Sequence, residues 1–224
     1  MFHFTISQGI LIAVVVYLIV GYLNEFAAEN QVYQAIHQPA LFDRGHQWFP
    51  VMPQLYTNVV LIGLVVYFLV RWCVKHPKVF ENYLWLIALL FAGRVIMFTM
   101  TQFPPATTDC SSVARNDPLH FMLMKSDWKE CMDYMFSGHA LHSVLIALFV
   151  WYLSDNMIEK LVVLGVVLLE LFLIIASRMH YTADVLVGSL VVILAFYAWP
   201  GVNKVTENIQ SGGIFGTMLT KKHF

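Results

Sequence analysis

Charged residues are scarce in this chain: Asp, Glu, Lys and Arg make up 12% of its 224 residues, while 59% are hydrophobic. A soluble domain carries about 25% charged residues. The net charge of −1 leaves no excess of basic residues for binding nucleic acid. This composition predicts an integral membrane protein and argues against both a soluble domain and a nucleic-acid-binding protein.

Several catalytic and cofactor motifs are also missing. The sequence has no H-E-x-x-H or C-x-x-C metal motif, no Gly-rich nucleotide loop and no G-x-S-x-G elbow. Six further histidines show no metal-ligand spacing: His3, His37, His46, His76, His120 and His223. We therefore predict no metal, no nucleotide and no other cofactor.

Cysteine is rare, with three residues in the chain. Cys110 and Cys131 fall in the long connection between two apolar segments, on the side of the membrane that is predicted below to face outward. Oxidation is possible there, so a Cys110–Cys131 disulfide is one prediction and two free thiols are the alternative. Cys73 lies toward the other side and has no obvious partner.

Six apolar segments come close to the roughly 20 residues that cross a bilayer. They are residues 6–23, 54–70, 83–103, 137–153, 157–176 and 181–199. The sequence thus predicts an all-α fold, a six-helix transmembrane bundle forming a single catalytic domain over residues 1–224. We expect the first segment to be a retained signal anchor, because no basic residues precede it and no clear cleavage site follows it.

The distribution of Lys and Arg predicts the orientation in the membrane. One face has seven basic residues: Arg71, Lys75, Lys78, Lys160, Lys204, Lys221 and Lys222. The other face has five: Arg44, Arg115, Lys125, Lys129 and Arg178. Because basic residues are enriched on the cytoplasmic side, both termini are predicted to be cytoplasmic. The two histidine motifs described next then face the lumen or the outside.

The first motif, Ser137-Gly138-His139, begins the fourth apolar segment. Ser137 suits a helix N-cap, and Gly138 lets the backbone approach a ligand closely. Free N–H groups at such a helix start attract phosphate, and His139 can protonate a leaving oxygen. The alternative is an ordinary interfacial histidine. His142, three residues later, fits polar packing better than a second catalytic base.

The second motif places Asp184 four residues after His180. On a helix these positions share a face, so Asp184 can fix the imidazole tautomer and raise its nucleophilicity. The alternative is that Asp184 only complements the helix dipole. Arg178 either binds a phosphate oxygen or extends to lipid headgroups. Two histidines and one aspartate without a metal cluster favour phosphoryl transfer through a phosphohistidine.

Arg94 and Glu170 are charges inside apolar segments, roughly 13 Å and 12 Å from the outer face at about 1.5 Å of rise per residue. Either they form a buried ion pair between the third and fifth helices, or Arg94 contacts a substrate phosphate while Glu170 positions Arg94 or a histidine. Asp133 either meets a cationic headgroup amine or is a solvated loop acid.

These residues resemble a known family. The run Cys131-x-Asp133-Tyr134-x-Phe136-Ser137-Gly138-His139 resembles the Cys-Gly-Asp-x-x-x-Ser-Gly-His-Thr motif of the sphingomyelin synthases, which include ceramide phosphoethanolamine synthases. His180-Tyr181-Thr182-x-Asp184-Val185 resembles their His-Tyr-x-x-Asp-Val motif. The stretch from Arg94 through Pro104-Pro105 to Cys110-Ser111 is similar to their third-helix region. Phe49-Pro50-Val51-Met52-Pro53 is more weakly similar to their Pro-x-Pro-Asp segment.

The resemblance implies membership of the lipid phosphate phosphatase superfamily, with six transmembrane helices, cytosolic termini and an exoplasmic site. It implies transfer of phosphocholine or phosphoethanolamine from a glycerophospholipid donor to ceramide, with release of diacylglycerol. His180 would be the nucleophile oriented by Asp184, and His139 would protonate the diacylglycerol oxygen and then deprotonate ceramide. In a eukaryote such an enzyme would reside in the Golgi or plasma membrane, and the sequence leaves the organism open. Met132 and Ala140 depart from the family motif beside the phosphate pocket.

Three other functions compete with this interpretation. A lipid phosphate phosphatase or phospholipase C-like hydrolase would use water as acceptor, but the Lys-x6-Arg-Pro motif is absent and His180 follows Ser177-Arg178 after one residue instead of five. A related transferase would use phosphatidylinositol as donor. A non-catalytic membrane protein such as a transporter would place polar residues at the midplane of several helices. The sequence leaves the donor headgroup, the acceptor lipid and the choice between monomer and homo-oligomer open.

Overall fold

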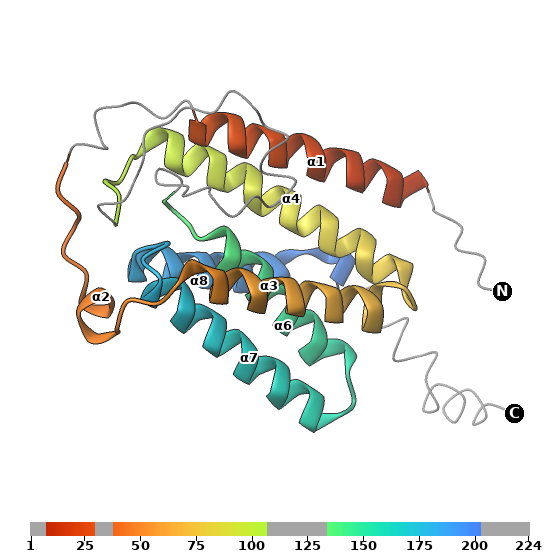
Figure 1. Cartoon of the computed structure of the whole chain (residues 1–224). Helices are drawn as coiled ribbons and strands as arrows, with labels where there is room; N and C mark the ends of the chain where they lie inside the picture. Colours follow the sequence, from red (N-terminus) through yellow and green to blue (C-terminus); the bar gives the residue numbers. More distant parts are fainter. Residues whose placement is uncertain (1–7, 30–37, 107–133, 203–224) are drawn as a thin grey trace, which may run out of the picture.

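The computed structural model describes residues 8–29, 38–106 and 134–202. These residues form α1 (Gln8–Glu29), α2 (Arg44–Trp48), α3 (Gln54–Phe68), the π-helical turn η2 (Leu69–Cys73), α4 (Pro77–Met100), α6 (Gly138–Leu153), α7 (Met157–Ala176) and α8 (Thr182–Ala198). The long helices lie side by side, with α1 along α4 on one side and α7 on the other (Figure 1). Because α6 packs against α3, α4, α7 and α8, it is the central helix of the bundle.

Some helices begin or end outside the apolar segments expected from the sequence. The helix α4 begins at Pro77 and not near residue 83, because proline has the right φ for a first helical position. Lys78 and Glu81 form an ion pair at 2.7 Å on this added turn. Likewise, α3 continues through η2 to Cys73, and α1 extends to Glu29. Hydropathy locates the apolar part of a helix and misses its polar ends.

Three helices of the described chain are long and apolar enough to cross a membrane: Gln8–Ala28, Gln54–Cys73 and Pro77–Met100. The apolar helices α6 and α8 are shorter, with 16 and 17 residues. The helix α7 has 20 residues, including the charged Glu159, Lys160 and Glu170. The all-helical architecture is therefore confirmed for the described residues, while the six spans and the cytoplasmic termini stay predictions.

The outward faces of the long helices are apolar. Exposed large hydrophobic side chains occur on α1, α3, α4, α7 and α8, for example Leu11, Val59, Ile96, Leu161 and Leu190. A helix that is apolar on its outer face as well as its inner face is typical of a lipid-embedded bundle. The membrane character predicted from the composition thus agrees with the structure.

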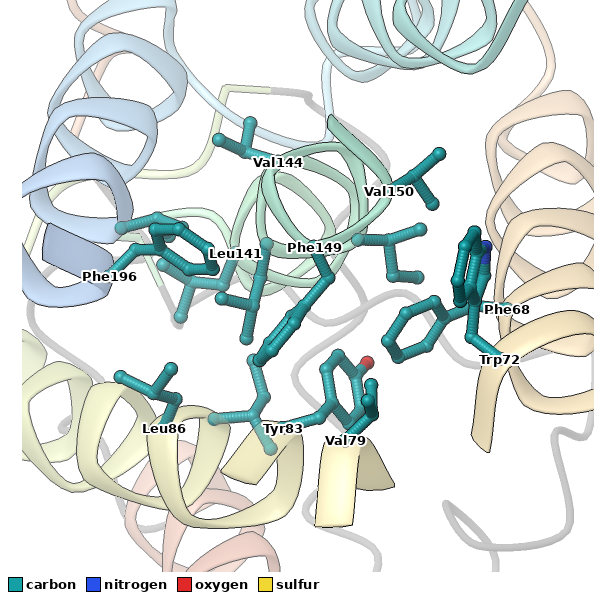
Figure 2. Packing of buried hydrophobic residues seen from close by; sticks show 14 of the residues in the cluster. Phe68, Trp72, Val79, Tyr83, Leu86, Leu141, Val144, Phe149, Val150 and Phe196 are labelled. Carbon is teal, nitrogen blue, oxygen red and sulfur yellow. The ribbon is translucent and has the colours of Figure 1, made fainter. Parts of the chain in front are cut away.

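Aromatic rings fill the space between α3, α4, α6 and α8. The Phe68 ring lies 5.2 Å from the Tyr83 ring and 5.7 Å from the Phe149 ring, measured between centroids. Phe149 is also 5.2 Å from Phe196 on α8. Figure 2 shows these rings gathered beside α6, with Phe196 on the α8 side and Phe68 on the α3 side. This packing holds α6 in place, so that the start of α6 is presented at one end of the bundle.

A polar cluster closes the opposite end. Glu159, in the first turn of α7, accepts hydrogen bonds from Tyr67 and Ser154. Its carboxylate also lies 3.2 Å from Nε of Arg71. These contacts join the end of α3 to the α6–α7 connection, so both lie at the end of the bundle remote from the first residue of α6.

Candidate active site

The first turn of α6 lies beside a buried arginine. The Ser137 hydroxyl accepts a hydrogen bond from the Ala140 N–H at 3.3 Å and so caps the helix, as predicted. Arg94 of α4 donates from Nε to the Phe136 carbonyl at 2.6 Å. A Cβ on Gly138 would lie 3.8 Å from Cζ of Arg94. The guanidinium charge of Arg94 and the positive end of the α6 dipole therefore both produce a positive electrostatic potential at Gly138.

Arg94 does not pair with Glu170, so the interpretation of these two residues as a buried ion pair is wrong. Nη1 of Arg94 instead donates to Oδ1 of Asn24 on α1, at 2.5 Å. Glu170 is fully buried, and neither carboxylate oxygen has a hydrogen-bond partner among the described residues. The Phe136 carbonyl and the Asn24 amide both help to hold Arg94. The predicted depth of Arg94 in the membrane does not reveal these contacts.

The two predicted motifs meet at the starts of α6 and α8. The Ser137 N–H donates to the Asp184 backbone carbonyl at 3.3 Å. Gly188, one turn further along α8, makes room for this approach, because a Cβ there would lie 3.4 Å from Cβ of Phe136 and 3.5 Å from N of Ser137. Residues that are far apart in the sequence thus form one site.

His180 and Asp184 face each other, but not along one helix as the i,i+4 argument expects. His180 precedes α8, which begins at Thr182. Asp184 is the third residue of α8, and its Oδ2 accepts the Tyr181 N–H at 3.1 Å. His180 Nδ1 lies 3.6 Å from this same Oδ2, which is longer than a hydrogen bond.

The pair is buried and partly unsatisfied. His180 and Asp184 are 3% and 2% exposed. Nδ1 of His180 and Oδ1 of Asp184 have no hydrogen-bond partner within the described part of the chain. A small rotation of either side chain would bring Nδ1–H onto the carboxylate, as catalytic hydrogen bonds often tighten only when substrate binds.

His139 points toward α3. Its Nε2 lies 3.0 Å from Oδ1 of Asn58, and the ring is half-buried. With the amide oxygen as acceptor, Nε2 carries the hydrogen. Asn58 is not among the residues predicted from the sequence, although an amide inside an apolar segment is a functional signal.

His142 has a different environment from His139. Its Nδ1 is 2.6 Å from the Tyr83 hydroxyl. Its ring centroid lies 5.4 Å from that of Phe91 and 6.4 Å from that of Tyr17. These contacts fit the predicted role in polar packing.

Arg178 interacts with backbone carbonyls. It donates to the carbonyls of Phe49 at 3.0 Å and Ile175 at 3.3 Å, and also to that of His46. The phosphate contact and the lipid-headgroup contact expected from the sequence stay predictions. Arg178 holds the segment around α2 against the end of α7.

The α2 segment contributes two polar residues that contact the His180 loop. Asp43 accepts from the Thr182 N–H and hydroxyl, each at 2.7 Å. His46 Nε2 is 3.0 Å from the His180 carbonyl. The sequence offers little signal for either residue, because both lie in a short polar stretch without a recognisable motif.

The electrostatics of these two side chains follow from their contacts. Burial raises the pKa of Asp43, but hydrogen bonds from Thr182 and from the His46 N–H outweigh it, so the pKa lies below its ordinary value of 3.8. Burial lowers the pKa of His46 below 6.5, against the opposing effects of the His180 carbonyl and the Asp43 carboxylate. Near neutral pH, Asp43 is therefore ionised and His46 is neutral.

Three predicted residues lie outside the described residues: Asp133, Cys110 and Cys131. Cys73 is a buried free thiol. Within the described ranges, no group of three or more His, Cys, Asp or Glu side chains is arranged to hold a metal ion.

The chain is similar to known proteins. Residues 130–200 match the PAP2 superfamily C-terminal family. The chain is 33% identical over 119 residues to a phosphatidylinositol:ceramide inositolphosphotransferase of Trypanosoma cruzi (strain CL Brener), covering 49% of this chain and 35% of that protein. It is 28% identical over 165 residues to a phosphatidylethanolamine:ceramide ethanolaminephosphotransferase of Trypanosoma brucei brucei, covering 65% of this chain and 50% of that protein.

The matched regions span half or less of the length of these two relatives. The family match over residues 130–200 includes both histidine motifs of this chain, which begin at Ser137 and His180. These matches confirm the resemblance predicted from the sequence.

Proposed function

We propose that this chain is a sphingomyelin synthase-like enzyme of the lipid phosphate phosphatase superfamily and transfers a phosphorylated headgroup from a glycerophospholipid to ceramide. Its similarity to the PAP2 superfamily C-terminal family and to two ceramide phosphotransferases supports this proposal. The reaction passes through a phosphohistidine and releases diacylglycerol. The enzyme is a multi-pass membrane protein whose site faces the lumen or the outside.

One observation carries this proposal. The backbone contact from Ser137 N–H to the Asp184 carbonyl at 3.3 Å docks the two histidine-bearing segments onto each other. Arg94 then lies next to the start of α6, and Asp184 lies next to His180. The arrangement combines a site for an anionic phosphate with a carboxylate-supported imidazole, the two parts that nucleophilic attack on phosphorus requires.

In the first half-reaction, His180 attacks the phosphorus of the donor. Nδ1 faces Asp184, so Nε2 is the attacking nitrogen. A bond forms between Nε2 and phosphorus while the bond from phosphorus to the glycerol oxygen breaks. His139 gives a proton to that oxygen, and diacylglycerol leaves. Asp184 stabilises the positive charge that develops on the His180 ring.

In the second half-reaction, His139 takes the proton from the primary hydroxyl of ceramide. The hydroxyl oxygen attacks phosphorus, and the bond to Nε2 of His180 breaks. The headgroup is then attached to ceramide and His180 is free again. Protons balance, because His139 first releases a proton and then recovers one.

The donor phosphate is bound by Arg94 and the backbone N–H groups at the start of α6. The helix α6 has no acidic side chain in its first turn, so its positive end is available to an anion. Asp133 and Glu170 remain proposed substrate contacts. The two relatives are named for phosphatidylinositol and phosphatidylethanolamine as donors, so these are tested together with phosphatidylcholine.

The experiment uses the purified full chain in liposomes with fluorescent ceramide. Phosphatidylcholine, phosphatidylethanolamine and phosphatidylinositol are offered in separate reactions, and lipid products are separated by chromatography. His180→Gln is compared with His76→Gln, which changes a histidine in the turn before α4. Radiolabelled donor tests whether an acid-labile, alkali-stable label forms on the protein without ceramide.

A phosphorylated ceramide that requires one donor and disappears only in His180→Gln supports the proposal. Diacylglycerol formed without any ceramide product identifies water as the acceptor and replaces the transferase with a hydrolase. No turnover of any donor overturns an enzymatic function of this site. Ceramide product without a protein-bound label, even in rapid-quench samples, overturns the phosphohistidine.

A further inference from the structure

The loop that carries His180 is held from outside its own helices. Residues 177–181 connect α7 to α8, and Arg178 in this loop has φ of 60°. That conformation is unfavourable for a residue with a side chain, so it persists only where surrounding contacts impose it. The segment that supplies these contacts is residues 41–49.

We propose that His46 is a positioning residue for His180, and that Asp43 holds His46 and the start of α8 in register for this purpose. His46 Nε2 is 3.0 Å from the His180 backbone oxygen. A carbonyl can only accept, so Nε2 carries the hydrogen. This inference rests on the proposed function, in which the His180 imidazole is the nucleophile.

Asp43 connects both sides of this contact. Its Oδ1 accepts the His46 N–H at 3.0 Å, which caps α2 and sets the position of His46. The same carboxylate accepts the Thr182 N–H and hydroxyl at 2.7 Å each, at the first residue of α8. One ionised side chain therefore fixes the distance from His46 to the start of the helix that bears Asp184.

The ring of His46 adds a second constraint. It stacks on the Tyr181 ring with a centroid distance of 5.5 Å and an interplanar angle of 27°. The Tyr181 hydroxyl accepts the Leu41 N–H at 3.0 Å and donates to the Pro104 carbonyl at 2.9 Å. The residue after His180 is thus held by stacking and hydrogen bonds.

Holding the His180 backbone matters because the His180–Asp184 pair is not closed. Nδ1 of His180 is 3.6 Å from Oδ2 of Asp184, and this Nδ1 has no hydrogen-bond partner among the described residues. A displacement of the loop by about 1 Å would break alignment of the nucleophile, a change that costs up to about a hundredfold in rate. His46 controls this displacement through the carbonyl of the catalytic residue.

The test compares His46→Ala, His46→Gln and His46→Asn in the full chain reconstituted in nanodiscs. Gln places an amide N–H where Nε2 lies, whereas Asn places it near Nδ1. The first readout is the ¹⁵N spectrum of selectively labelled histidines, with the His180 ring assigned from His180→Gln. These shifts report the ring tautomer and do not depend on activity. The second readout is kcat and KM for headgroup transfer, and His76→Ala is the matched control.

We expect His46→Ala to move the His180 ring signals and lower kcat by roughly five- to tenfold at unchanged KM, the range expected for one lost hydrogen bond. His46→Gln should restore both, and His46→Asn should not. If His46→Ala fails to fold, as judged by its thermal midpoint, the Gln and Asn variants decide the question.

Unchanged His180 signals in His46→Ala, or equal defects in the Gln and Asn variants, overturn the proposal. If the wild-type chain shows no transfer from any donor, the proposed function fails, and the ring signals alone still decide whether His46 positions His180.

Discussion

Asp184 serves two neighbours with one carboxylate. Its Oδ2 accepts the Tyr181 N–H at the start of α8 and also faces His180 Nδ1. Its Oδ1 has no hydrogen-bond partner among the described residues. The bond to Tyr181 fixes where the carboxylate lies and leaves its second oxygen beside the His180 loop without a partner among the described residues.

Replacing this carboxylate by an amide separates its two roles. In Asp184→Asn an oxygen can still accept the Tyr181 N–H, but the neutral group no longer stabilises a positive His180 ring. We expect kcat for transfer to ceramide to fall roughly 10²–10⁴-fold with little change in thermal stability. Asp155→Asn, at an exposed position between α6 and α7, is the matched control. Transfer within about twofold of wild type in Asp184→Asn would contradict the catalytic role.

Asn58 contributes to the orientation of His139. Because Asn58 Oδ1 is 3.0 Å from His139 Nε2, Asn58→Ala removes the acceptor that holds the ring. We expect initial rates to fall about two- to tenfold, the effect of one hydrogen bond. Thr99→Ala, which removes an exposed hydroxyl bonded to its own helix, should leave the rate unchanged. A native rate in Asn58→Ala would show that His139 is held by other groups.

At the scale of elements, α2 is too short to be stable alone. It has five residues, whereas isolated helices need about 12–15. Its structure depends on the Asp43 cap and on close packing against α7 and α8. Gly45 allows this approach, because a Cβ there would lie 2.3 Å from Oγ1 of Thr182 and 2.9 Å from Cγ2 of Ile175.

The substitution Gly45→Ala should therefore separate α2 from α8. The Thr182 hydroxyl cannot move aside without losing its bond to Asp43, so we expect a loss of about 1–3 kcal/mol in the free energy of unfolding. Activity should fall with it. Gly63→Ala is the control, since nothing lies within 4 Å of its added Cβ, and it should stabilise α3 slightly. Thermal unfolding in detergent and transfer assays measure both. Equal midpoints for the two variants would contradict the tight approach of α2.

At the scale of the whole molecule, the two ends of the bundle differ in chemistry. The site end carries the starts of α6 and α8 together with α2. The other end carries the ion pair between Arg71 and Glu159 and the basic residues Lys75 and Lys78. Basic residues are enriched on the cytoplasmic side of membrane proteins. The basic residues around the connection from α3 to α4 thus lie at the end of the bundle remote from the site.

This grouping predicts opposite accessibility for two engineered cysteines. Phe42 is 71% exposed near the site, and Asp155 is exposed in the α6–α7 connection. In sealed microsomes, a membrane-impermeant maleimide should label Asp155→Cys directly and Phe42→Cys only after detergent is added. The native chain gives the baseline. The reverse pattern would place the site on the cytoplasmic side.

The local features of the site were predictable from the sequence. Ser137 caps α6 and Asp184 lies near His180 because chain connectivity keeps residues three or four apart within reach of each other. The apolar segments likewise predicted helices, since burial in lipid requires every backbone group to be bonded within its own helix. Even here the expected helical pairing of His180 with Asp184 differs from the structure, in which His180 precedes the helix.

Only the tertiary structure decided which distant residues support the site. Arg94 contacts Asn24, His139 contacts Asn58 and His46 contacts His180 across separations of 70, 81 and 134 residues. Such contacts depend on how all the helices pack, and one sequence contains no local pattern that specifies them. The sequence by itself determined the membrane character, the helical segments and the two histidine motifs. The packing determined that Arg94 has no ion pair with Glu170, and that residues around α2 hold the loop of His180.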